Sequence, residues 1–168
     1  MPTSARSIRN FMSKKICVLI LENLRSVENT ASIFRTAEAL GVSKIILVGT
    51  TPAPVDRFGR KRQDFTKVSL GAETTNWEYV KDLGFTIYDL RDQGFTIIAL
   101  EQGPKAKKLG SFEANKLERF ALVVGNEVEG VSRIVLDICD EIVEIPMQGK
   151  KESLNVSVAT GIALFMLL

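Results

Sequence analysis

Apolar residues gather along this chain in short runs separated by stretches of helical periodicity. Residues 16–21 form a continuous apolar run of strand length, which is typical of a strand covered on both faces. Similar runs predict further strands at 44–48, 96–100, 119–124 and 141–145. Strands that alternate with helices favour an α/β domain with a largely parallel sheet.

Helices are predicted between these strands. From about Glu28 to Leu40 the apolar positions recur at helical spacing, and Gly41 supplies a stop signal. Further helical stretches are predicted at 77–83, 88–93 and 133–138, and a last helix from Leu154 to the end. Residues 50–74, rich in turn-forming and short polar residues, are expected to form a long loop or a loosely structured insert.

Length and composition favour one globular domain. The 168 residues suffice to bury a core, so we expect a single domain at 16–168 after a short basic leader at 1–15. The leader has no apolar stretch of signal-peptide length, and the apolar run 156–168 is too short to span a bilayer. A cytoplasmic protein without a membrane segment is therefore expected.

The net charge of +2 is too small to indicate a nucleic-acid partner by itself, but local basic clusters exist. They are Arg57, Arg60, Lys61, Arg62 and Lys67; Lys105, Lys107 and Lys108; and Lys150 and Lys151. Each cluster alone could be a solvated loop. Three clusters in three loops favour a polyanionic partner, because phosphate contacts supply most non-specific nucleic-acid affinity.

The chain contains no histidine. This excludes the commonest general base, the commonest transition-metal ligand and every histidine-dependent triad. The two cysteines, Cys17 and Cys139, lie far apart in apolar runs without metal or redox spacing, so we interpret them as reduced core thiols. No metal is expected to be required.

Two polar residues on the first predicted helix allow two interpretations each. Arg35 falls about 200° from Ile33 on the helical wheel and should point out of the core. It could be a functional cation or a surface arginine paired with Glu38. Asn29, in the first turn, could instead satisfy free backbone N–H groups at the helix start.

Two loops connect a strand to a helix. The loop 125–130 begins and ends with glycine, which permits close backbone approach to a ligand, but it has neither dinucleotide nor P-loop spacing. The second loop, 145–155, contains Ser153, a suitable helix cap.

Three segments together resemble a known family. Residues 29–37, 122–132 and 145–157 are similar to the three motifs of the SpoU/TrmH-type RNA ribose 2′-O-methyltransferases of the SPOUT class, and residues 67–73 match a segment that similar members carry. All motifs occur in the right order at strand-to-helix junctions. The resemblance extends over roughly residues 16–168.

The resemblance implies a parallel-sheet SPOUT (α/β-knot) fold with a C-terminal trefoil knot, S-adenosylmethionine bound in the knot, and a homodimer acting on tRNA or rRNA. The implied cofactor contacts are Leu100, Gly125, Ile145 and Leu154. The implied catalytic residues are Arg35, Asn29, Glu127, Ser153 and Asn155. For RNA binding we expect Arg57, Arg60, Lys61 and Arg62.

A role for Arg35 can be inferred from its chemistry. A guanidinium is a poor proton acceptor, so Arg35 should stabilise a developing 2′-alkoxide and anchor the adjacent phosphate, oriented by Glu127 and Asn29. Methyl transfer from a sulfonium suits a chain without histidine, because the cofactor supplies a good leaving group.

Two other classes remain open: a catalytically silent RNA-binding module on the same fold, and an unrelated α/β nucleotide-binding protein, which the missing phosphate loop disfavours. The expected dimer depends on residues 162–168, which are apolar all round and should be buried on all sides, so that a twofold partner would cover one side. Alternatively, the 50–74 loop could fold over this helix in a monomer.

Overall fold

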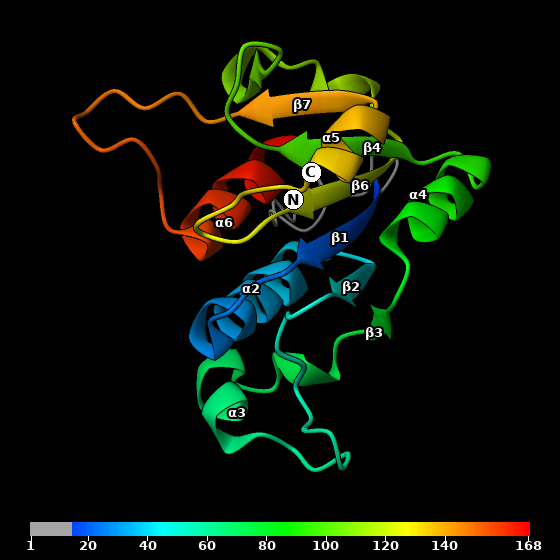
Figure 1. Ribbon diagram of the computed structural model, residues 1–168, viewed down its shortest axis with the longest axis vertical. Coiled ribbons are helices and arrows are strands. Elements are labelled where there is room, and N and C mark those ends of the chain that lie inside the picture. Colours follow the sequence, from blue (N-terminus) through cyan, green and yellow to red (C-terminus); the bar gives the residue numbers. More distant parts are fainter. Residues whose placement is uncertain (1–14) are drawn as a thin grey trace, which may run out of the picture.

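The computed structural model describes residues 15–168 (Figure 1). The expected leader therefore lies almost entirely outside the described residues. The core of the structure is one parallel sheet of seven strands in the order β3-β2-β1-β6-β4-β7-β5, which confirms the predicted parallel α/β architecture. The strands are β1 (Ile16–Glu22), β2 (Lys44–Val48), β3 (Trp77–Val80), β4 (Thr96–Leu100), β5 (Lys107–Lys108), β6 (Arg119–Val124) and β7 (Glu141–Glu144).

Helices cover both faces of the sheet and separate the core into two clusters. One cluster joins Cys17, Leu19 and Leu21 of β1 to α2 (Val27–Leu40), α3 (Gln63–Ser69) and α6 (Val156–Leu167). The other joins the alternate residues, Val18 and Ile20, to α4 (Leu83–Asp92) and α5 (Arg133–Ile138). Successive side chains of a strand point to opposite faces, so a continuously apolar strand contributes to both clusters.

Helix α2 has the predicted limits because its ends are capped. The Ser26 side chain accepts a hydrogen bond from the Asn29 N–H at 3.1 Å, and Gly41 closes the helix with a φ of 77°. Phe34 on its buried face meets Phe65 of α3 edge-to-face, with ring centroids 5.1 Å apart. This contact holds α3 against α2.

Two predictions of local structure were wrong. Residues 77–83 were expected to be helical, but Trp77–Val80 forms strand β3 beside β2, because aromatic and β-branched residues suit an edge strand. The helix begins only after Asp82, whose side chain accepts from the Phe85 N–H at 2.8 Å. The 50–74 segment is not only a loop, since burial of Phe65 supports α3 within it.

The order of the strands places the loops that matter side by side. The chain builds β1, β2 and β3 outward in one direction, and β6 later enters between β1 and β4. The carboxyl ends of β4, β6 and β7 therefore lie together, where ligands bind in open parallel sheets. The trefoil knot stays a prediction. Within residues 15–168, no helix is both long and apolar enough to cross a membrane.

Candidate functional site

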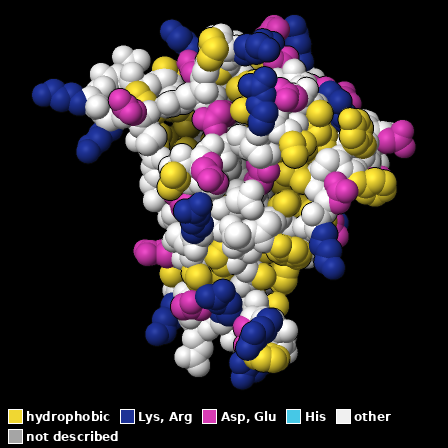
Figure 2. Space-filling view, in the orientation of Figure 1, with side chains coloured by type: hydrophobic (Ala, Val, Ile, Leu, Met, Phe, Trp, Pro, Cys, Tyr) yellow, Lys and Arg dark blue, Asp and Glu magenta, His cyan; other side chains and the backbone are white. Residues whose placement is uncertain are grey.

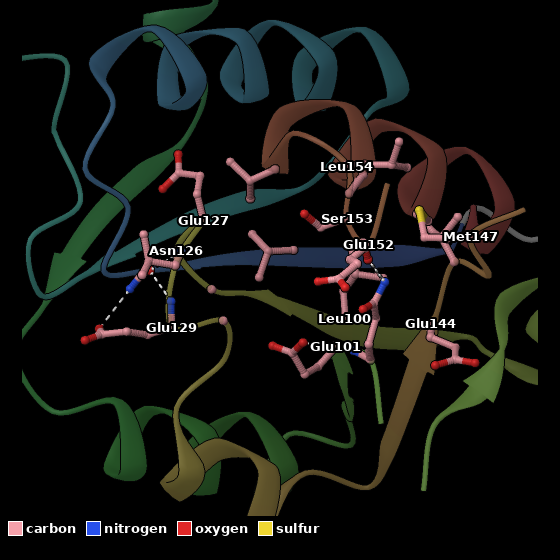
Figure 3. Close-up of a pocket in the computed structure, with 18 residues that line it drawn as sticks. Leu100, Glu101, Asn126, Glu127, Glu129, Glu144, Met147, Glu152, Ser153 and Leu154 are labelled. Carbon is pink, nitrogen blue, oxygen red and sulfur yellow. Dashed lines mark hydrogen bonds between the residues drawn. The ribbon is translucent and has the colours of Figure 1, made fainter. Parts of the chain in front are cut away.

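A cavity of about 360 Å³ opens at the carboxyl ends of β4, β6 and β7 (Figure 3). All four residues predicted to contact a cofactor line it: Leu100, Gly125, Ile145 and Leu154. Figure 2 shows the hollow at the upper left, beneath the long loop that Figure 1 shows leaving β7. The structure thus brings together residues from three loops that are distant in sequence.

The loop after β6 is fixed by its own polar groups. The buried Asn126 side chain accepts hydrogen bonds from the N–H groups of Val128 at 2.9 Å and Glu129 at 2.7 Å. A Cβ on Gly125 would lie 2.0 Å from the Gly130 carbonyl oxygen, so only glycine fits there. The backbone that lines the cavity is therefore preorganised.

Two glutamates, at the ends of the strands on either side of β6, hold the far end of this loop. Glu22, a buried residue that ends β1, accepts from the Ser132 N–H at 2.9 Å. Glu101, just after β4, accepts from the Val131 N–H at 2.8 Å. Sequence analysis missed both. Their common signal is a carboxylate directly at the end of an apolar strand, where buried charge requires partners.

Asn29 joins the three motifs. Its Nδ2 donates to Glu127 Oε1 at 2.5 Å, and its Oδ1 accepts from Asn155 Nδ2 at 3.1 Å. The interpretation of Asn29 as a helix-start cap was wrong, because the Ser26 side chain caps α2. The Asn29 side chain is committed instead to the two other motifs.

The start of α6 also differs from the expectation. Asn155 caps the helix, its Oδ1 accepting from the Ser157 N–H at 2.8 Å, so α6 begins at Val156 rather than Leu154. Ser153 is therefore not the cap. It is exposed and lines the cavity beside Leu154 (Figure 3).

Arg35 is exposed on α2 and points away from the core, as the helical wheel predicts. The eight ion pairs within residues 15–168 do not include it, so the expected alternative of a pair with Glu38 is wrong. It does not line the cavity either. One chain therefore assembles four of the five predicted catalytic residues and leaves Arg35 apart.

The cavity is strongly acidic. Among residues 15–168 its lining has no lysine or arginine and includes five glutamates: Glu101, Glu127, Glu129, Glu144 and Glu152. Arg25 approaches Glu129 at 3.9 Å, but both side chains are largely exposed. This arrangement favours a ligand that carries positive charge and disfavours a phosphate in the cavity.

The predicted RNA-binding residues lie in a separate turn, residues 55–62, which we name the basic hairpin. Within it Arg60 pairs with Asp56 at 2.8 Å, and Arg62 pairs with Asp64 of the following helix α3 at 3.0 Å. Hydrogen bonds lower the pKa of the Asp56 carboxyl below its usual value, and the largest contribution comes from the backbone N–H of Arg60. Arg57 and Lys61 are exposed and enter no ion pair with residues 15–168.

The remaining titratable groups of residues 15–168 give no sign of a second centre. Both cysteines are free thiols, and burial raises the pKa of Cys17 to about 12. In the described part of the chain, no three histidine, cysteine or acidic side chains are grouped to hold a metal.

The fold and the site together define a parallel α/β protein whose ligand cavity is built from the loops after β4, β6 and β7. Residues 16–165 match the SpoU rRNA Methylase family, and the chain belongs to that family. It is 33% identical over 154 residues to the 23S rRNA (guanosine-2′-O-)-methyltransferase RlmB of Neisseria meningitidis serogroup B, a match covering 91% of this chain and 58% of that protein. RlmB of Escherichia coli K12 is 36% identical over 149 residues, with 88% and 58% covered.

Solved structures agree with this assignment. The AdoMet-bound rRNA methyltransferase from Sinorhizobium meliloti superposes with a TM-score of 0.79 at 25% identity, covering 95% of this chain and 59% of that one. The TrmH/SpoU tRNA-modifying enzyme of A. aeolicus gives 0.78 at 28% identity, covering 92% and 74%. The chain spans 58% of the length of each of the two RlmB relatives, which is less than two thirds.

Proposed function

We propose that this protein transfers a methyl group from S-adenosylmethionine to a ribose 2′-oxygen of tRNA or rRNA in the cytoplasm. The observation that carries the proposal is the Asn29 side chain, which links Glu127 and Asn155 and so unites the three family motifs beside one cavity. The RNA methyltransferases among the relatives support the same reaction.

The cavity fits the cofactor. Its volume lies within the range of small-molecule sites, about 300–1,000 Å³, and its apolar walls include Leu100, Ile145 and Leu154. The five glutamates suit a molecule with a sulfonium and an ammonium group. When bound, S-adenosylmethionine supplies an electrophilic methyl group with a good leaving group behind it. The preorganised backbone at Gly125 would hold it in place.

The polar residues then act on the ribose. Glu127 is fixed by Asn29, and Asn155 is fixed by both Asn29 and the start of α6, so the three side chains present a rigid polar edge to the substrate. Ser153 is exposed at the cavity and available to the ribose. Arg35 would stabilise the developing 2′-alkoxide electrostatically.

Arg35 would reach this edge from a second copy of the chain. Helix α6 packs on α2 but leaves an apolar stripe open, with Val158 51%, Ile162 37% and Phe165 76% exposed. Within residues 15–168, this helix is therefore not buried on all sides. Segment 50–74 leaves these side chains uncovered, since its helix α3 packs on α2. A twofold partner would cover the stripe through an isologous interface.

The dimer is tested by sedimentation equilibrium at micromolar concentration. A mass near twice 18.6 kDa, lost in Phe165→Glu, is the expected result. Phe85→Glu is the matched control, because Phe85 is 73% exposed on α4, on the other face of the sheet. A wild-type mass near 18.6 kDa would contradict the dimer.

Methylation is tested by incubating the purified protein with labelled S-adenosylmethionine and total RNA, followed by mass spectrometry of the nucleosides. A new 2′-O-methylnucleoside is expected. RNA and cofactor binding without product would indicate the silent RNA-binding module. Calorimetry without cofactor binding would instead contradict the proposed reaction.

A further inference from the structure

Phe58 is an aromatic residue at the tip of the basic hairpin, outside the predicted RNA-binding set. It is 66% exposed, an unusual position for a large apolar side chain within a cluster of cations. The Arg57 guanidinium carbon lies 4.7 Å from the centroid of its ring, and that of Arg60 lies 5.0 Å away. Both distances are typical of cation–π contacts.

The hairpin that presents this ring is a defined turn. Val55 and Lys61 form an antiparallel bridge, and Gly59 takes a φ of 77°, which favours glycine. The Asp56 carboxylate accepts from the N–H groups of Phe58 at 2.8 Å and Arg60 at 3.0 Å. The backbone that carries the ring is therefore fixed.

Arg57 and Arg60 differ in how strongly their guanidinium groups are held. Arg60 is tied to Asp56 by its Nε at 2.8 Å as well as by the ion pair, so its guanidinium stays beside the ring. Arg57 is exposed and enters no ion pair with the described residues 15–168, so it can move to a ligand. An exposed aromatic ring on a fixed backbone, a guanidinium held by a carboxylate, and a second guanidinium without an ion pair among residues 15–168 together match a nucleotide with its base unpaired.

We propose that Phe58 and Arg60 form a stacking platform for an unpaired RNA base, while Arg57 contacts the neighbouring phosphate. The inference deepens the proposed function by naming how RNA is held. Figure 1 places segment 50–62 at the lower end of the molecule, and Figure 2 shows dark-blue basic side chains there, away from the acidic cavity. The stacked nucleotide is thus remote from this chain's own cavity.

The test is fluorescence anisotropy with a labelled oligoadenylate of about 12 nucleotides, within the roughly 4–16 nucleotides of known single-strand sites. Phe58→Leu keeps an apolar side chain and should weaken binding about fivefold or more, whereas Phe58→Trp should bind as the wild type does. The salt dependence of Phe58→Leu should not change, because no charge is removed. Phe85→Leu, an exposed phenylalanine on α4, is the control.

An abasic oligonucleotide with the same number of phosphates separates stacking from a general effect. The loss in Phe58→Leu should disappear on this ligand. Equal affinities of wild type and Phe58→Leu for oligoadenylate, as a protein-docking role of Phe58 would give, overturn the platform. So does an equal loss on abasic RNA. Because this assay needs no methyl transfer, a failed methylation assay with Phe58-dependent binding would contradict only the proposed reaction.

Discussion

The cavity and the basic hairpin are stabilised in opposite ways. In the hairpin, the side-chain polar contacts join residues at most four positions apart, such as Asp56 with Arg60. At the cavity, Asn29 contacts Glu127 across 98 positions and Asn155 across 126. The hairpin contacts are therefore local, whereas the proposed catalytic edge exists only once the sheet has brought its three motifs together.

The two regions also differ in charge. Five glutamates line the cavity, while the hairpin carries four cations, two of them balanced by Asp56 and Asp64. Opposite charges suit the two proposed ligands, a cationic cofactor and a polyanionic RNA. The RNA backbone would be attracted to the hairpin and the cationic cofactor to the cavity, so the two ligands do not compete for one surface.

The largest effect is expected at Arg35. Arg35→Ala should lower methyl transfer by about 10²–10³-fold, because it removes a donor to the developing alkoxide. Cofactor affinity should stay within a few-fold, since Arg35 does not line the cavity. Arg133→Ala, which removes an exposed arginine from α5, is the control. Turnover above a few per cent of wild type would refute the role of Arg35.

The next largest effect is expected at the cavity floor. Gly125→Ala places a methyl group against the Gly130 carbonyl and must displace the loop. Overpacking of this kind costs roughly 1–3 kcal/mol, so cofactor affinity should fall at least about tenfold. Gly103→Ala in the adjacent loop meets nothing within 4 Å and should bind normally. Calorimetric titration compares the two, and equal affinities would count against the preorganised loop.

A smaller effect is expected in the polar network. Asn29→Asp replaces the amide that donates to Glu127 with a second carboxylate. The lost hydrogen bond to a charged group is worth about 1.5 kcal/mol, so turnover should slow about tenfold. Asn115→Asp adds the same charge at an exposed site away from the cavity and controls for net charge. Initial rates of methyl incorporation provide the measurement. Unchanged rates in Asn29→Asp would mean that the bridge is dispensable.

The smallest effect is expected in the hairpin cations. Replacing Arg57 and Lys61 with alanine should reduce the log–log salt slope of RNA binding by about one unit per lost phosphate contact. Replacing Arg60 and Arg62 should reduce it less, because these two are already paired with carboxylates. RNA titrations at several salt concentrations measure both slopes. If neither changes, the hairpin is a solvated loop.

Much of the fold and several site residues followed from local pattern. The continuously apolar strands, the limits of α2 and the outward direction of Arg35 were predicted correctly, because each depends on burial periodicity or a nearby cap. Strand β3 and helix α3 were missed. Both are short and are stabilised by contacts distant in sequence: β3 pairs with β2, and α3 packs its Phe65 against Phe34. Phe58 was missed because an exposed aromatic residue in a loop leaves no periodic signal.

The sequence by itself determined the parallel α/β class and the order of the motifs, since these depend on residue type and spacing, and its resemblance to a known family supplied the candidate catalytic and cofactor-binding residues. Only the tertiary structure decided that Asn29 spans Glu127 and Asn155 rather than capping a helix, and that Glu22 and Glu101 hold the loop after β6. The physical reason is that a buried or shared polar group is satisfied by whichever partner the folded chain brings within hydrogen-bonding distance. That partner is set by strand order, which local periodicity does not encode.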